Sequence, residues 1–391
     1  MESLYIVFEL IKDVVCGKAL SEEAILAIKD GSCLGEIYKL SKKYDLLHLV
    51  ADALEKNNLL PQETEKREKI LKSRRSAVCR YEQLHYEFER IASLLEQEKI
   101  PYMPLKGAVL RAYYPQPWMR TSCDIDILVH AEDLEKARDS IIEALGYEQT
   151  TQTLHDVSLC ISKRIHLELH HCLIDESEAN SKELEVVGQT WEDAVPTQLG
   201  GYRYEMTWEM FYFYHVLHAA KHFRIGGCGI RPLLDLWILN HQILMDKERR
   251  EKLLKEAGLL TFAKAMERLS EVWFSGAQAD EVSKEMQSFI LRAGLYGGVE
   301  NNVAIQQKKK GGKGKYLRGR IFMPYKSLKK KYPILEKHKW LVPFYQIRRW
   351  FETVFKRGKL KNSINEAKLV MGNNENNQRV EALFEKLELW D

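Results

Sequence analysis

Apolar positions recur with helical spacing through the first hundred residues of the chain. The clearest helix is predicted from about Glu63 to Glu98, where apolar residues follow one another at steps of three and four. The members of this stripe are Ala77, Tyr81, Leu84, Phe88, Ile91 and Leu95. Three heptads with small and aromatic residues favour a helix that lies on its own domain over a coiled coil. We therefore expect an N-terminal helical segment over residues 1–98.

Residues 99–200 change to strand spacing, and their short alternating segments predict a small α/β unit. Strands are expected at 101–105, 123–129, 157–161 and 165–170, and helices over 108–114 and 134–145. The segment 123–129 begins with alternating polar and β-branched residues, which is typical of a strand with one buried face. Gly146 is placed to end the second helix, because glycine readily adopts the left-handed conformation of a helix C-cap.

Beyond residue 200 the pattern is helical again and predicts a C-terminal helical domain over 201–391. The segment Trp208–Phe223 is apolar on nearly all sides, so this helix is expected in the interior. Another helix is expected to begin at Arg231, where Pro232 is tolerated in the first turn. Further helices are expected at about 259–273 and 279–291.

The last part of this domain is strongly basic, although the whole chain carries a net charge of only +3. Residues 308–361 contain 19 lysines and arginines and two acids, Glu336 and Glu352, so this segment carries +17 and the remainder −14. Such a run is most often a solvated, mobile segment, but it also suits contact with a triphosphate, RNA or an acidic partner. The interleaved aromatic residues indicate that much of it packs against other groups.

Composition indicates a globular protein with no membrane-spanning segment. The 391 residues are 45% hydrophobic and 29% charged, enough for two or three domains with sizeable cores. No apolar run approaches the roughly 20 residues that a membrane-spanning helix needs, and charged residues interrupt the N-terminal stretch where a signal peptide would be apolar. The seven scattered cysteines contain no CxxC pair, which disfavours a disulfide scaffold or a zinc ribbon. A cytoplasmic location is therefore expected.

The strongest candidate for chemistry is Asp124-Ile125-Asp126, at the start of a predicted strand. Residues i and i+2 of a strand point to the same face, so the two carboxylates project together, roughly 7 Å apart. Two like charges at that distance repel each other, and a divalent cation such as Mg²⁺ compensates them through carboxylate oxygens. The alternative interpretation is two solvated acids at a strand end.

Basic residues around this segment favour the metal interpretation. Lys106-Gly107 closes one predicted strand where a helix begins, and glycine there lets backbone N–H groups approach a phosphate closely. Arg111 and Arg120 are both suited to neutralise phosphate charge. These residues predict a site for a metal-bound phosphate.

A third acid, Glu168, alternates with core-facing leucines on a later strand. His166 and His170 share its face and are expected either to orient it, to touch phosphate, or to be neutral histidines of the core or rim. If that strand pairs with the strand of Asp124 and Asp126, the three carboxylates lie together.

At this point the motifs resemble the nucleotidyltransferase superfamily that includes DNA polymerase beta and kanamycin nucleotidyltransferase. More closely, they resemble a branch of uncharacterised bacterial nucleotidyltransferase-like proteins. The motifs of that branch occur in order as Leu105-Lys106-Gly107, Tyr114-Pro115, Arg120, Asp124–Val129, Gly146-Tyr147 and Glu168-Leu169-His170, followed by His218–His222, Arg231–Asp235 and Tyr332-Pro333. The resemblance covers most of the chain.

The resemblance implies an α+β fold in which a small mixed-sheet nucleotidyltransferase core lies between helical domains. It implies an enzyme that uses Mg²⁺ (or Mn²⁺) to transfer a nucleoside monophosphate from an NTP such as ATP to an acceptor, with release of pyrophosphate. The acceptor is a small molecule, a sugar phosphate, a protein or RNA. Asp124 and Asp126 match the acids that hold the metal on the triphosphate, and Glu168 matches the acid that helps to bind a second metal and to activate the acceptor. The residues then expected at the triphosphate are Lys106, Gly107, Arg111 and Arg120.

One departure from the superfamily pattern is Ala108, which stands where a serine or glycine usually follows the glycine. The hydroxyl that often touches the triphosphate is absent there, and Lys106 is expected to take over its role. This departure leaves open an alternative function: a catalytically weak or inactive protein of the same fold that binds RNA or an acidic partner through residues 308–361.

Three histidines of the predicted interior helix, His215, His218 and His222, fall on one helical face. His218 and His222 have the spacing of a metal pair, but no HExxH or second ligand cluster supports zinc. Contact of His218 and His222 with the nucleotide or acceptor, and a structural role, are the other interpretations. Arg231 and Asp235, four residues apart, are expected to form an ion pair that orients helices.

Overall fold

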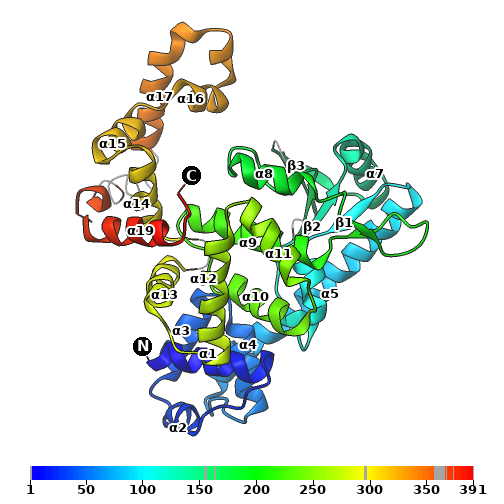
Figure 1. Ribbon diagram of the computed structural model, residues 1–391, viewed down its shortest axis with the longest axis vertical. Coiled ribbons are helices and arrows are strands. Elements are labelled where there is room, and N and C mark those ends of the chain that lie inside the picture. Colours follow the sequence, from blue (N-terminus) through cyan, green and yellow to red (C-terminus); the bar gives the residue numbers. More distant parts are fainter. Residues whose placement is uncertain are drawn as a thin grey trace. The chain divides into compact units, whose positions relative to one another are not determined.

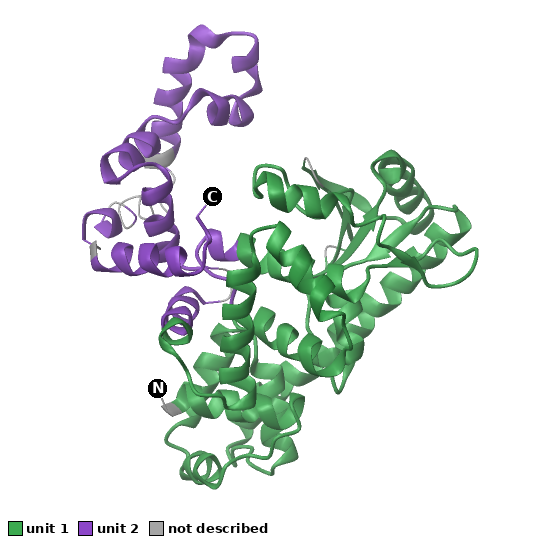
Figure 2. Cartoon of the chain, viewed as in Figure 1, with its two compact units in different colours: residues 1–221, 230–284, 391 green, residues 222–229, 285–390 purple. Residues whose placement is uncertain are grey.

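The computed structural model describes residues 2–153, 156–162, 164–294, 297–355, 366, 368–372 and 374–390. The chain forms two compact units (Figure 2): unit 1 comprises residues 1–221 and 230–284, and unit 2 comprises residues 222–229 and 285–390. Domain boundaries at residues 98 and 200 stay a prediction. Among the described residues, no helix combines the length and apolar character that a membrane crossing requires.

The described part of unit 1 begins with helices (Figure 1), as the apolar periodicity predicts. They are α1 (Glu2–Val15), α2 (Glu22–Asp30), α3 (Leu34–Lys43), α4 (Leu47–Lys56) and α5 (Thr64–Gln97). α5 matches the predicted long helix almost from end to end. Its buried residues Leu84, Phe88, Ile91 and Leu95 pack into the core of the following sheet. The prediction of a helix that lies on its own domain is therefore confirmed.

A mixed sheet follows α5. Its strands are β1 (Tyr102–Pro104), β2 (Asp124–Val129), β3 (Glu148–Gln152), β4 (Asp156–Ile161) and β5 (Ile165–His170), in the order β1-β2-β5-β4-β3. β2 and β5 are parallel, and the other neighbouring pairs are antiparallel. All residues of β3 are exposed, so it lacks the apolar alternation that predicts the other strands. The predicted α+β class, with a small mixed sheet between helical regions, is confirmed.

One face of this sheet forms the core of the α/β region. Ile125 and Ile127 of β2 and Leu167 and Leu169 of β5 pack with α5 and with α7 (Leu134–Leu145). Because apolar and acidic residues alternate along both strands, the acids project from the opposite face. Because the apolar face of the sheet is buried, the acidic residues of β2 and β5 must lie on the other face.

Further helices complete unit 1. They are α6 (Gly107–Leu110), α8 (Ser181–Gly188), α9 (Trp208–Arg224), α10 (Arg231–Gln242), α11 (Lys247–Glu256) and α12 (Leu260–Ser270), together with a small sheet of β6 (Val195–Pro196) and β7 (Tyr204–Glu205). A π-helical turn at Glu271–Ser275 leads towards α13 (Glu281–Ala293). Nearly all apolar side chains of α9 are buried, as predicted for an interior helix.

The described part of unit 2 contains residues 308–355 of the basic segment within and between its helices, and residues 356–361 lie outside the described residues. These helices are α14 (Val299–Lys309), α15 (Lys313–Ile321), α16 (Tyr325–Lys331), α17 (Val342–Phe355) and α19 (Asn374–Lys386), with short 3-10 turns at Pro333–Glu336 and Lys339–Leu341. Val303, Tyr316 and Val370 form a small apolar cluster. Leu328 and Leu335 are also buried. The prediction that the aromatic residues of this segment pack against other groups is confirmed for Tyr316. It is wrong for five others that are exposed: Phe322, Trp340, Phe344, Trp350 and Phe351.

Candidate active site

The acids predicted to lie together do meet on neighbouring strands. In the parallel pairing of β2 with β5, Asp126 is the register partner of Glu168. Ligand atoms of Asp126, Glu168 and His170 lie within 4.8 Å of one another, which suits a bound metal ion. Asp124 lies two residues before Asp126 and therefore on the same face of β2. The expected pairing of the two strands is therefore found, and it brings Glu168 beside Asp126. His170, and not Asp124, is the third member of the close group, and the roles of Asp124, Asp126 and Glu168 as metal ligands stay a prediction.

Asp126 is the buried centre of this group and is held by the side chains of Lys106 and His170. Lys106 Nζ lies 2.7 Å from Asp126 Oδ1, and His170 Nε2 lies 3.1 Å from the same oxygen. Burial alone would raise the pKa of Asp126, but Lys106 and His170 outweigh it and hold that pKa well below its ordinary value. Asp126 is therefore a permanent anion at neutral pH.

His170 joins two of the acids. Its Nε2 also lies 3.4 Å from Glu168 Oε2. Burial lowers the pKa of His170, yet the hydrogen bonds to Asp126 and Glu168 raise it above its ordinary value overall. His170 thereby fixes the two carboxylates relative to each other.

Asp124 carries the charge that its surroundings compensate least. Burial, followed by the neighbouring charges of Asp126 and Glu168, raises its pKa from 3.8 to about 6. A group with such a pKa gains from an added positive charge. The oxygen-rich set of Asp124, Asp126 and Glu168 has the ligand chemistry that Mg²⁺ and Mn²⁺ prefer.

The predicted phosphate turn lies next to the acids. Lys106 precedes α6 with a φ of 47°, a conformation that costs energy for a lysine and is typical of functional turns. At Gly107 an added Cβ would come within 3.4 Å of the Ser122 Cβ and 3.6 Å of Arg120 Nη1. Gly107 thus lies directly beside Ser122 and the guanidinium groups of Arg111 and Arg120.

Arg111 lies beside this turn without an acidic partner among the described residues. Its Nε donates to the carbonyl of Gly107 at 2.7 Å, and its Nη2 donates to Ser122 Oγ at 3.0 Å. Burial and the neighbouring charge of Arg120 lower the pKa of Arg111 to about 10. Two guanidinium groups held close together are suited to bind an anion.

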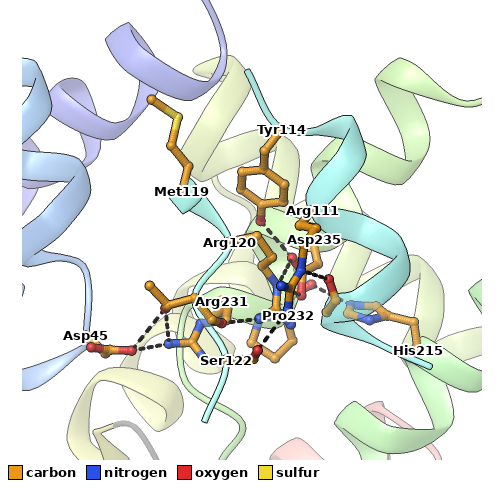
Figure 3. Close-up of polar contacts among 12 residues, drawn as sticks. Asp45, Arg111, Tyr114, Met119, Arg120, Ser122, His215, Arg231, Pro232 and Asp235 are labelled. Carbon is orange, nitrogen blue, oxygen red and sulfur yellow. Dashed lines mark hydrogen bonds and ion pairs between the residues drawn. The ribbon is translucent and has the colours of Figure 1, made fainter. Parts of the chain in front are cut away.

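Arg120 forms an ion pair with Asp235 that the sequence does not predict (Figure 3). Its Nε donates to both carboxylate oxygens of Asp235, at 2.7 and 3.0 Å, and the hydroxyl of Tyr114 donates to the same carboxylate at 2.7 Å. The expected ion pair between Arg231 and Asp235 is wrong. Arg231 instead pairs with Asp45, because Arg120 occupies the Asp235 carboxylate.

The histidines of α9 do not share one environment. His215 Nε2 lies 2.8 Å from the carbonyl of Pro232, which directs this side chain to α10 (Figure 3). The His218 ring lies 6.3 Å from the ring of Tyr214, and His222 belongs to unit 2. Roles of His218 and His222 as substrate contacts stay predictions.

Tyr214 is a residue of the site that the sequence analysis missed. Its hydroxyl lies beside Lys106, Asp126 and Glu168: burial and the two carboxylates raise its pKa, while Lys106 opposes them. Tyr214 precedes His218 by one helical turn, so the face of α9 with residues 214 and 218 is the one to search. The sequence analysis considered the helical face with His215, His218 and His222, and this set does not include Tyr214.

Comparison with known proteins identifies the family of this chain. No curated protein matches the chain. The solution structure of the antibiotic-resistance factor ANT(2'')-Ia is similar with a TM-score of 0.32 and 15% identity, over 46% of this chain and 92% of that one. A family model described as uncharacterised nucleotidyltransferase matches residues 33–275, which include the whole mixed sheet and its acids. The chain therefore belongs to the uncharacterised nucleotidyltransferase family, as the ordered motifs indicate.

Proposed function

We propose that this protein transfers a nucleoside monophosphate from an NTP to a hydroxyl or phosphate of an acceptor. The observation that carries the proposal is the grouping of Asp126, Glu168 and His170 on one face of two paired parallel strands, with Asp124 on the same face of β2. The acceptor oxygen bonds to the α-phosphorus, the bond from that phosphorus to the α,β-bridging oxygen breaks, and pyrophosphate leaves with the electron pair. When the acceptor is a hydroxyl, its proton passes to Glu168; a phosphate oxygen attacks as an anion and needs no proton acceptor.

The three carboxylates fit a divalent metal by charge and by ligand type. Asp124 and Asp126 would hold Mg²⁺ or Mn²⁺ on the triphosphate, and Glu168 would share in holding a second ion. When bound, these ions supply positive charge to the phosphate and attacking oxygens. The raised pKa of Asp124 supports this assignment, because excess negative charge at the acids is its cause after burial.

The triphosphate is proposed to bind at the turn around Gly107. Lys106 and Arg111 supply positive charge there, and Arg120 Nη1 lies on the same side of the turn. Ser122 is uncharged, and its hydroxyl accepts a hydrogen bond from Arg111 Nη2 at 3.0 Å. We assign to Ser122 the hydroxyl contact that Ala108 does not provide.

The acceptor is proposed to approach from the side of α9. Tyr214 lies beside Lys106 and Glu168, and His218 lies one helical turn further along the same helix. His170 orients Glu168 through the contact at 3.4 Å. Tyr214 and His170 are thus the groups proposed to lie next to the carboxylate that accepts the proton.

The test is pyrophosphate release from each NTP with Mg²⁺ or Mn²⁺ and a cell extract as the source of acceptor. We expect Asp126→Asn to abolish release and to weaken Mn²⁺ binding measured by electron paramagnetic resonance. Asp139→Asn is the matched control, because Asp139 is an exposed acid of the same unit that pairs with Arg138. Equal release by Asp126→Asn and the unsubstituted protein would reject the proposal.

Chelation of the divalent metal distinguishes a nucleotidyltransferase from the alternative function, a polyanion-binding protein of the same fold. A nucleotidyltransferase binds NTP with divalent metal and loses it in EDTA. A polyanion binder keeps its ligand in EDTA and loses it steeply with salt. The grouping of three acids on one face favours the catalyst.

A further inference from the structure

α17 of unit 2, orange in Figure 1, carries large apolar side chains that are open to solvent. Phe344, Ile347, Phe351 and Phe355 are spaced by three, four and four residues and are 45% to 77% exposed. This spacing places them along one side of the helix, which we call the apolar stripe. Trp340, in the 3-10 turn before α17, is also exposed.

Gln346 and Trp350, on the opposite side of α17, make contacts within unit 2, although Trp350 is still 37% exposed. Gln346 is buried and donates to the carbonyl of Met323 at 2.6 Å. Trp350 Nε1 donates to the carbonyl of Ile321 at 2.7 Å. These contacts hold the helix in place without the apolar stripe. A continuous exposed apolar surface of this kind is typical of an interaction site.

The segment that carries the apolar stripe is rich in positive charge. Residues 313–355 contain 12 lysines and arginines and two acids, and both acids are already paired: Glu336 with Lys329, and Glu352 with Lys331 and Arg348. Six basic residues of this range form no ion pair with a described carboxylate: Lys315, Arg318, Lys326, Lys330, Lys337 and Lys339. The surface is therefore complementary to an anionic one.

We propose that the apolar stripe and these basic side chains bind the surface of an anionic lipid bilayer, with α17 lying in the plane of the interface. The boundary between headgroups and acyl chains accommodates all four apolar side chains, while lysine and arginine reach the lipid phosphates. A nucleic acid fits less well, because the stripe offers no hydrogen-bonding group and Ile347 at its centre has no ring for base stacking. The proposal is independent of nucleotidyl transfer.

The test is co-sedimentation of the full chain with vesicles of phosphatidylcholine alone and of phosphatidylcholine mixed with phosphatidylglycerol. We expect binding to the mixed vesicles that weakens as salt is raised. The variant Phe344→Ser/Phe351→Ser/Phe355→Ser should bind about tenfold more weakly or worse, because it removes the side chains that enter the interface. Lys337→Gln/Lys339→Gln should weaken binding by about fivefold per charge removed.

The control variant is Leu199→Ser/Leu244→Ser, which removes two fully exposed leucines of unit 1. It should bind vesicles like the unsubstituted protein. Unfolding midpoints of all variants are compared, since the replaced side chains are exposed and should leave them unchanged. Failure to bind the mixed vesicles overturns the proposal, as does equal binding by the triple phenylalanine variant. Stripe-dependent binding of poly(U) or of an acidic protein instead of vesicles would assign the surface to that partner and equally overturn it.

Discussion

Replacing Asp235 with asparagine tests the buried ion pair that supports the proposed triphosphate turn. The Asp235 side chain is 1% exposed and is held by Arg120 and Tyr114. Asparagine keeps the shape and an acceptor oxygen for Tyr114, but it leaves the guanidinium of Arg120 as an uncompensated buried charge. Breaking one side of such a pair costs about 3–5 kcal/mol. In a unit of this size that cost lowers the midpoint of thermal unfolding by roughly 6–20 °C.

Scanning calorimetry of Asp235→Asn measures this shift, with the exposed Asp139→Asn as a control that should leave the midpoint unchanged. The double variant Arg120→Met/Asp235→Leu removes both charges and should recover most of the loss, because apolar side chains of similar volume replace buried ion pairs well. A midpoint for Asp235→Asn within about 2 °C of the unsubstituted protein would refute the reasoning. So would a double variant as unstable as the single one.

Two further predictions concern acid stability and the proton acceptor. Burial lowers the pKa of His48 from 6.5 to about 4 despite the hydrogen bond to the Met119 carbonyl, so the unfolded chain binds the proton more tightly. The free energy of unfolding should therefore fall as pH drops from 6.5 to 4, by about 3 kcal/mol from this group; urea titrations should show a smaller fall in His48→Gln, and an equal fall contradicts the assignment. Glu168→Gln should slow pyrophosphate release by about 10²–10⁴-fold while Mn²⁺-dependent NTP binding persists, and an unchanged rate rules out Glu168 as the proton acceptor.

Helices and strands whose apolar residues repeat with a regular period were predictable from the sequence. The stripe of α5 and the alternation in β2 follow from the geometry of helix and strand, because apolar side chains repeat with the period of the element that buries them. β3 was not predictable in this way, because a strand exposed at the edge of a sheet buries no side chain. The same holds for Tyr214, whose place among apolar neighbours on α9 carries no sign of the polar group at its tip.

Ion pairs between residues far apart in the sequence were the main feature that the sequence did not predict correctly. The sequence favoured Arg231 with Asp235, because residues four apart meet on a helix. Packing instead places Arg120 against Asp235 and Arg231 against Asp45. A buried carboxylate is satisfied by whichever guanidinium the tertiary structure brings to it, since leaving either charge buried and unpaired costs several kcal/mol.

The sequence by itself determined the elements with a regular apolar period and the side of β2 and β5 on which their acids lie. Only the tertiary structure decided which strands are neighbours, and therefore that Glu168 joins Asp126 and that Lys106 and His170 neutralise it. The physical reason is that periodicity is set by local backbone geometry, whereas strand order and charge pairing depend on how the whole core is buried.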